Sequence, residues 1–283
     1  MTGPGLYYSM PAAEYHADCC DEPSLSSSIA NILLTSTPKH ARAAHPRLNP
    51  AAKNVSTKAM DLGSVTHELL LGRGSGFECL PFDDYRSPPA RHWRDNVIAR
   101  GKIPIKSEEL DVGFRMASSV RSILVEIPGI ARALIDGNAE PVAIWRDKLG
   151  PICRTMIDWL DLEGGIIWEL KTTRTGIGDR SLNAKIAGED TAFDMRAAFR
   201  QRGLAHLFPS RDFVFRWIFV ESSEPFEARV FEADETTRVI GERRCEFAIS
   251  KWHECLTANS WPGYPRKIET AQYPDWAIAD MHL

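Results

Sequence analysis

The sequence predicts an α/β domain in which helices flank a mixed β-sheet. Helical patterns fill most of the first 134 residues, apolar runs typical of strands follow between 139 and 173, and a helix, a hairpin and a long last helix complete the chain. No repeat or low-complexity tract interrupts this order. The 283 residues can bury one sizeable core, so we expect a single domain over residues 1–283.

The N-terminal part is expected to consist of helices that follow an extended arm of about residues 1–24. Ser27–Thr35 follows a serine start signal and ends before Pro38, because the residue before a proline disfavours the helical conformation. Lys58–Leu71 is the first long helical pattern, whereas Gly72–Pro89 is rich in glycine and proline and predicts a loop. Further helices are expected at 91–99, 107–125 and 128–134.

The second half of the chain alternates strands with helices. The apolar runs at 139–146, 152–160 and 165–173 are separated by turn residues and predict a three-stranded antiparallel meander. The polar segment 175–190 is expected to have little fixed structure, and 191–208 predicts a helix. The last elements are a hairpin and a helix that Asp234 caps, with expected bounds 212–221, 226–232 and 234–256. The apolar stripe of this last helix comprises Ile240, Phe247, Trp252 and Leu256.

Asp158, Glu169 and Lys171 form the most informative pattern. The predicted turn centres near Glu163, so Asp158 lies roughly opposite Glu169, and cross-strand neighbours about 5 Å apart could share one divalent cation. Glu169 and Lys171 are two residues apart on a strand and project from the same face. A cation held by two acids neutralises phosphate charge and acidifies a water, and an ammonium group orients that water. This is the chemistry of phosphodiester hydrolysis.

A simpler interpretation of these residues stays open. An acid two residues before a lysine is common on solvated strand faces. Asp158 is harder to explain in that way, because it lies between Ile157 and Trp159 in an apolar run, where an ionised carboxylate is costly without a partner. A metal would supply that partner, and so would a structural hydrogen bond.

Charge and cysteine content restrict the possible functions. The net charge of −4 argues against a surface that coats nucleic acid without specificity, although a local basic channel remains compatible with it. The six cysteines lack Cys-x2-Cys spacing, so we expect free thiols rather than a zinc ribbon. Neither a signal peptide nor a membrane span is predicted, so we expect a cytoplasmic protein without a membrane partner. Candidates for the basic channel are Arg86, Arg91, Arg94, Arg100, Lys102, Arg196, Arg200 and Arg202.

Asp158 followed by Glu169-x-Lys171 resembles the core of the PD-(D/E)xK nuclease superfamily. From about Tyr8 to Trp276, the chain is more narrowly similar to the RecE-type exonuclease domain, exodeoxyribonuclease VIII. The similarity includes an opening serine-rich helix, a helix that bears a histidine, a middle segment and a C-terminal tail. These parts are Ser24–Ser28, Ala59–Leu69, Trp93 with Gly101 and Lys102, Trp261–Tyr264 and Pro274–Trp276.

The resemblance implies a PD-(D/E)xK core with a metal site. His67, Asp158 and Glu169 would ligate Mg²⁺ or Mn²⁺, with the Leu170 carbonyl as a further ligand, and Lys171 would position the attacking water. His67 should then lie within about 5 Å of the Asp158 carboxylate. The resemblance also implies linear double-stranded DNA ends as substrate, resection of the 5′ strand in phage-type recombination, a homo-oligomeric ring and a single-strand annealing partner.

One position departs from the family pattern. Where the family has glutamine in a Gln-x-Ala-hydrophobic pattern, this chain has Arg196, and Gln201 lies on a different face of the same helix. We expect Arg196 to point along the DNA path and contact a phosphate, because a guanidinium beside a divalent cation would repel it. Arg200, one turn further on, is another candidate for DNA binding, as are Arg154 and Arg174.

Two other functions therefore stay open. The first is a DNA-binding or assembly protein that keeps the fold without catalysis, which a fixed cation at Arg196 would suit. The second is another PD-(D/E)xK nuclease of the Cas4-like or restriction type. Cas4-like enzymes carry closely spaced C-terminal cysteines, and Cys245 and Cys255 are too far apart to imitate them.

Overall fold

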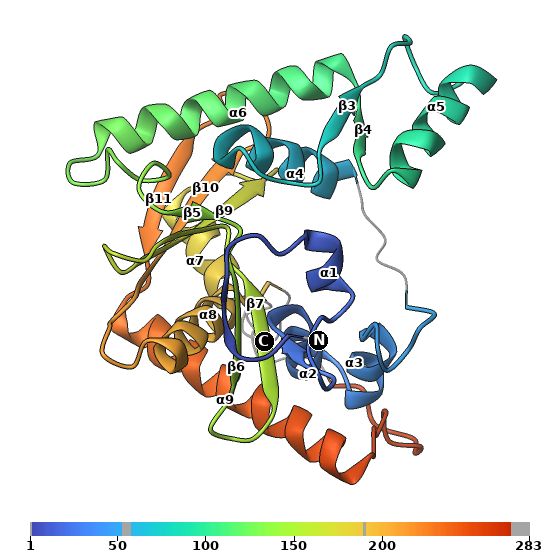
Figure 1. The fold of residues 1–283 in the computed structure, drawn as a ribbon, viewed down its shortest axis with the longest axis vertical. Helices are drawn as coiled ribbons and strands as arrows, with labels where there is room; N and C mark the ends of the chain where they lie inside the picture. Colours follow the sequence, from blue (N-terminus) through green and yellow to red (C-terminus); the bar gives the residue numbers. More distant parts are fainter. Residues whose placement is uncertain (1, 53–57, 189–190, 273–283) are drawn as a thin grey trace.

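The computed structural model describes residues 2–52, 58–188 and 191–272. They form an α/β fold with mixed sheets flanked by helices, as the sequence predicts (Figure 1). The helices are α1 Ala12–His16, α2 Ser27–Thr35, α3 Pro38–Ala44, α4 Lys58–Leu71, α5 Pro88–Ala99, α6 Ser107–Glu126, α7 Asp179–Ala187, α8 Phe193–Leu207 and α9 Glu235–Ala258. The strands are β1 Gly5–Tyr7, β2 Leu25–Ser26, β3 Phe77–Cys79, β4 Ile103–Ile105, β5 Asn138–Ala139, β6 Val142–Arg146, β7 Ile152–Met156, β8 Trp159–Asp161, β9 Ile166–Thr173, β10 Val214–Glu221 and β11 Ala228–Glu232.

A five-stranded sheet in the order β11-β10-β9-β8-β5 carries the longest strands. β9 and β10 run parallel at its centre, and β10 forms the expected hairpin with β11. Both faces of β10 are buried: Trp217 and Phe219 pack in a cluster with Leu204 of α8, whereas Ile218 packs with Met116 of α6. Parallel strands covered on both faces read as continuous apolar runs, which explains the pattern of this segment.

The predicted meander is wrong in one respect, because its strands divide between two sheets. The expected strand 152–160 breaks at Ile157 and Asp158 into β7 and β8. β7 pairs with β6 in a four-stranded sheet of order β1-β6-β7-β2, while β8 pairs with β9. At the break, Ile157 N donates to Pro141 O and Glu140 N donates to Asp158 O. Glu140 has a φ of 50°, so the segment between β5 and β6 bends beside the break between β7 and β8.

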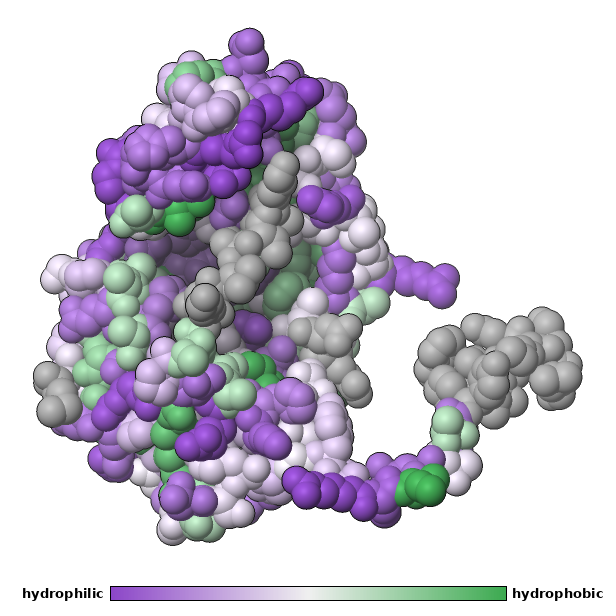
Figure 2. Space-filling model, turned by 90° about the vertical axis from the view of Figure 1, so that its right-hand side faces the viewer, coloured by the Kyte–Doolittle hydropathy of each residue, from purple (hydrophilic) through white to green (hydrophobic). Residues whose placement is uncertain are grey.

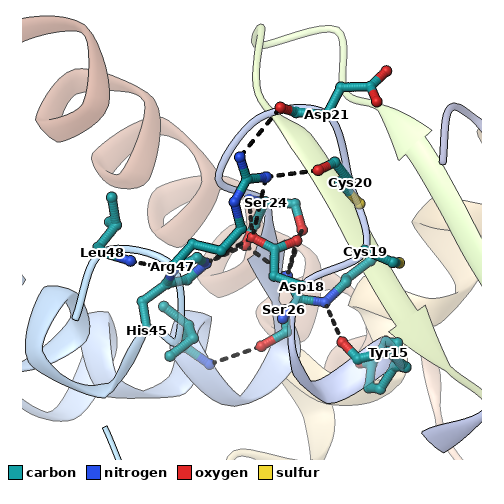
Figure 3. Close-up of polar contacts among 12 residues, drawn as sticks. Tyr15, Asp18, Cys19, Cys20, Asp21, Ser24, Ser26, His45, Arg47 and Leu48 are labelled. Atoms are coloured by element: carbon teal, nitrogen blue, oxygen red, sulfur yellow. Dashed lines mark hydrogen bonds and ion pairs between the residues drawn. The ribbon is translucent and has the colours of Figure 1, made fainter. Parts of the chain in front are cut away.

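The N-terminal segment is folded onto the core and does not form a free arm. β1 pairs with β6, and β2 pairs with β7. Between them, buried Asp18 accepts hydrogen bonds from Ser24 N at 3.0 Å and Ser24 Oγ at 2.7 Å (Figure 3). Asp18 also pairs with Arg154 at 2.9 Å and with His45 Nε2 at 3.3 Å. These contacts offset the cost of burying the carboxylate and join the segment to α3 and β7.

The apolar stripe predicted for α9 is only partly correct. Ile240 and Phe247 are 47% and 57% exposed, whereas Trp252 is fully buried. The face that packs on the core contains smaller side chains, because α8 approaches α9 closely: a Cβ on Gly241 would lie 2.5 Å from Asp194 O. The buried face comprises Gly241, Cys245, Ala248, Ile249, Trp252 and Cys255.

Two other segments differ from expectation. The polar segment 175–190 contains α7, since Leu182 and Ile186 lie one turn apart and both pack in the core beside α8. The helix expected at 128–134 is replaced by turns, and Gly129 there has a φ of 84°, which a helix does not allow.

Residues 77–105 form a small extension beside α4, in which β3 and β4 pair in parallel and α5 connects them (Figure 1). Across the described ranges, no helix is both long and apolar enough to span a membrane. The cysteines are free, as expected, and Cys153, Cys245 and Cys255 are among the buried ones.

Candidate metal-dependent active site

Asp158 and Glu169 meet at the open end of the β8–β9 hairpin. The register pairs Trp159 with Trp168, so Asp158 lies one position beyond the last pair, on the side of Glu169. Asp158 Oδ2 accepts a hydrogen bond of 2.9 Å from Leu170 N, which holds this carboxylate against β9. The hairpin therefore brings the two acids together, as the sequence pattern predicts.

Glu169 is almost completely buried, at 2% exposure, and is held by two cations. Its Oε1 accepts from Lys171 Nζ at 2.5 Å and from an Arg200 terminal nitrogen at 2.9 Å. Its Oε2 is buried and has no hydrogen-bond partner in the described structure. A buried carboxylate oxygen without a donor is costly, and a divalent cation would satisfy it.

His67 approaches the same acids from α4. Its Nε2 lies 3.6 Å from Asp158 Oδ1, within the predicted distance, and its Nδ1 lies 3.7 Å from Glu140 Oε1. Burial would lower the pKa of His67, but the charge of Asp158 and then of Glu140 outweighs it, so the pKa is raised. Burial would likewise raise the pKa of Asp158, yet the charges of His67 and Lys171 hold it well below its usual range. Asp158 is therefore ionised at neutral pH.

Glu140 is a member of this cluster that sequence reasoning missed. It follows β5 at the break between the two sheets, and Arg73 Nε lies 3.5 Å from its Oε2. Glu140 thus faces one nitrogen of His67 while Asp158 faces the other, which orients the imidazole ring. No spacing in the sequence links Glu140 to His67, since the two meet only through the packing of α4 on the sheet.

The donors present fit a divalent cation with a preference for oxygen. Asp158 and Glu169 supply carboxylate oxygens and His67 supplies an imidazole, a set that suits Mg²⁺ or Mn²⁺. The N–H and C=O groups of one strand residue point to the same edge, so the Leu170 carbonyl faces the edge at which its N–H meets Asp158. Among the described residues, no group of three His, Cys, Asp or Glu side chains lies close enough together to hold a metal ion in this structure. The Glu169 carboxylate pairs with Lys171 and Arg200.

A model of the family described as "PDDEXK-like domain of unknown function (DUF3799)" matches residues 26–274. The chain belongs to this family. The match spans most of the chain, including the strands that carry Asp158, Glu169 and Lys171. It confirms the resemblance to the PD-(D/E)xK superfamily, while the narrower RecE-type resemblance stays a prediction.

One solved structure shows the same fold at low sequence identity. A crystal structure from Eubacterium rectale, of a protein provisionally named an exonuclease, superposes with a TM-score of 0.61 at 9% identity and covers 96% of this chain and 98% of its own. A second structure, SSO0001, covers 69% of this chain and 86% of its own at 12% identity, but its TM-score of 0.27 supports no conclusion. No curated protein matches the chain with significance.

The arginines of α8 lie inside this PDDEXK-like domain. Arg200 is 7% exposed and pairs with Glu169, so its guanidinium is engaged inside the candidate site, and its contact with DNA stays a prediction. Arg196 Nε donates to Thr191 O at 3.0 Å, and burial, followed by the charge of Arg200, lowers the pKa of Arg196. Its contact with a phosphate stays a prediction. Gln201 donates to Phe213 O on another face of the helix, as expected.

Arg154 and Arg174 differ in their surroundings. Arg154 is 3% exposed, donates to the carbonyl oxygens of Tyr15 and Ser24, and pairs with Asp18. Its guanidinium is therefore engaged in internal contacts, which weigh against the predicted role in DNA binding. Arg174 follows β9 and is exposed, so it remains a candidate.

Proposed function

We propose that this protein is a divalent-metal-dependent deoxyribonuclease that acts on the ends of linear double-stranded DNA. The observation that carries the proposal is the buried Glu169 Oε2, which has no hydrogen-bond partner among the described residues, on the strand position opposite the ionised Asp158. Lys171, on the same strand face, supplies the ammonium that this chemistry uses. The PDDEXK-like family and its fold support the proposal.

Each residue of the site has a distinct task in this proposal. Asp158, Glu169 and His67 would hold Mg²⁺ or Mn²⁺, together with the Leu170 carbonyl. The bound ion would neutralise charge on the scissile phosphate and acidify a water. Lys171 donates a hydrogen bond to the attacking water and holds it in line with the phosphorus. Glu140 keeps the His67 ring in place, since it faces the nitrogen that Asp158 does not.

The finer parts of the proposal rest on the RecE-type resemblance. They are resection of the 5′ strand in phage-type recombination, a homo-oligomeric ring around DNA and a single-strand annealing partner. Figure 2 shows a hollow between the upper part of the molecule, which carries α4 to α6, and the lower part, and this hollow supports an enclosed path for DNA. Exposed Arg174 follows the strand that bears Glu169 and could contact such a substrate.

Digestion of end-labelled linear duplex with Mg²⁺, Mn²⁺ or EDTA tests the proposal. Asp158→Asn and Glu169→Gln keep the side-chain shape but remove the charge, so each should lower the rate by at least about 100-fold. Glu163→Gln is the matched control, because it makes the same change at an exposed position in the turn of the same hairpin. Digestion by both site variants at the wild-type rate would exclude this active site.

The same assay separates the alternatives. A closed circular duplex should resist an exonuclease, and its cleavage would indicate a restriction-type enzyme. A non-catalytic DNA-binding protein is favoured by one observation, namely that two fixed cations hold Glu169 while arginine stands at position 196. If the wild-type protein does not cleave with either metal but Arg196→Gln does, the chain is a silenced nuclease.

A further inference from the structure

A groove between α3 and the segment after α9 lies outside the candidate active site. Two adjoining hollows of about 520 and 580 Å³ share Lys39, Ala43 and Trp261 in their walls, so they form one continuous surface. We name it the α3–tail groove. Its charged and aromatic members are Lys39, His40, Arg42, Trp261, Tyr264 and Arg266.

Contacts with the body of the protein hold the groove in shape. Lys39 N donates to Pro262 O at 3.1 Å, which joins the segment to the start of α3. Trp261 packs edge-on against fully buried Trp252 of α9, with ring centroids 5.1 Å apart. The groove is therefore anchored to the core on both sides.

The groove is cationic in a chain whose net charge is −4. Lys39, Arg42 and Arg266 are exposed, and no ion pair between described residues engages them. None of the described residues in its walls carries a carboxylate. Such a local concentration of unpaired cations attracts polyanions even though the whole molecule is acidic.

Aromatic and amide groups stand among these cations. Tyr264 is 67% exposed, and its ring packs edge-to-face with the His40 ring, with ring centroids 5.5 Å apart. Trp261 is partly exposed, and Asn49 and Asn259 add amide groups to the wall. A site for a phosphate alone has no need of exposed rings, whereas planar bases stack on them.

We infer that the α3–tail groove binds single-stranded nucleic acid, with Lys39, Arg42 and Arg266 on phosphates and the rings of Trp261 and Tyr264 against bases. A duplex keeps its bases stacked on each other and cannot use these rings, so the groove prefers a single strand. The inference goes beyond the proposed function, because binding here needs neither metal nor cleavage.

Fluorescence anisotropy with labelled oligothymidylate in EDTA tests the inference without digestion. The triple variant Lys39→Gln/Arg42→Gln/Arg266→Gln should bind about tenfold more weakly at low salt. It should also lower the slope of log K against log salt by about 2, because each phosphate contact on a single strand contributes about 0.7. Tyr264→Ala should weaken binding about fivefold or more through lost stacking. The matched control Lys148→Gln/Arg238→Gln/Arg243→Gln removes the same charges from exposed sites outside the groove and should bind as wild type.

Cross-linking then locates the bound strand. An oligonucleotide with 4-thiothymidine should form adducts within residues 259–267, mapped by mass spectrometry, and a parallel oligouridylate shows whether DNA or RNA binds more tightly. The inference would be overturned by adducts confined to residues 158–174 or by a triple variant that binds like its matched control. Competition by polyglutamate as strong as that by unlabelled oligothymidylate would also overturn it. Groove binding by a protein that never cleaves DNA would refute the proposed function alone.

Discussion

At the scale of single residues, the two oxygens of Glu169 have different surroundings. Oε1 is satisfied by Lys171 and Arg200, and Oε2 has no donor. Arg200 Nε is likewise buried without a partner. The carboxyl group is thus fixed in position, yet one of its oxygens is left for a ligand.

Arg200→Gln should increase affinity for Mn²⁺ by about tenfold. A guanidinium 2.9 Å from Glu169 repels a cation bound to the same carboxylate, and its removal leaves Lys171 to balance the charge. Free Mn²⁺ measured by electron paramagnetic resonance gives the affinity directly. Arg243→Gln, on the exposed side of α9, is the control. Weaker Mn²⁺ binding in Arg200→Gln would show that the guanidinium supports the site instead.

At the scale of elements, α8 connects the two sheets. Arg200 reaches Glu169 on β9, and Arg202, two residues on, pairs with Asp147 in the turn after β6. The Arg202 contact is bidentate, with Nε at 2.6 Å and a terminal nitrogen at 3.0 Å from the carboxylate. Both carboxylates are nearly inaccessible, so each ion pair must form when the sheets assemble around the helix.

Asp147→Asn should destabilise the fold by about 2–4 kcal/mol at neutral pH, because it removes the bidentate partner of buried Arg202 and leaves only the half-exposed Glu246, at 3.2 Å, as its counter-charge. Burial would raise the pKa of Asp147, but the hydrogen bonds and charge of Arg202 outweigh it and lower the pKa. The stabilisation is present above the unfolded pKa of about 3.9 and is lost as the pH falls through the lower folded value. Urea unfolding at pH 7, 5 and 3 should show that the difference in free energy of unfolding between Asp147→Asn and wild type decreases at the lowest pH. A difference that stays constant, or an equal difference for the exposed Asp212→Asn, would contradict this account.

Gly241→Ala should destabilise the protein by about 1–3 kcal/mol, although alanine stabilises an exposed helix site by about 1 kcal/mol. The new Cβ would lie 2.5 Å from Asp194 O, so α8 and α9 would have to move apart. Thermal or urea unfolding measures the change. An unchanged or increased midpoint would show that the two helices separate without cost.

At the scale of the whole molecule, the site lies where three parts of the chain meet. α4 brings His67, the five-stranded sheet brings Asp158 and Glu169, and α8 brings Arg200. α4 and the sheet each supply only some of the proposed ligands, so metal binding at this site would be coupled to folding.

Saturating Mn²⁺ or Mg²⁺ should therefore raise the melting temperature. At a metal concentration 100 times the dissociation constant, the stabilisation is about 2.7 kcal/mol, which corresponds to several degrees for a chain of this size. EDTA should reverse the increase. Differential scanning fluorimetry with wild type, Asp158→Asn and the control Glu163→Gln measures it, and an equal shift in all three would place the ion elsewhere.

Most of the elements that were predicted correctly from the sequence are set by interactions between residues close together in the chain. Ser26 accepts a hydrogen bond from Ile29 N at the start of α2, and Asp234 does the same for Thr237 N at the start of α9. The meeting of Asp158 with Glu169 follows from a short turn and the two-residue period of a strand, which the sequence displays directly.

The sequence by itself thus determined most of the longer helices, the β8–β9 hairpin and the paired acids, because each arises within about 20 residues of chain. Only the tertiary structure decided which charges lie inside. Arg154 bonds to Tyr15 across 139 residues, and Arg200 reaches Glu169 across 31. It also decided that Glu140 faces His67 and that the meander divides between sheets. An arginine on a surface and an arginine in a buried ion pair have the same local pattern, and only packing distinguishes them.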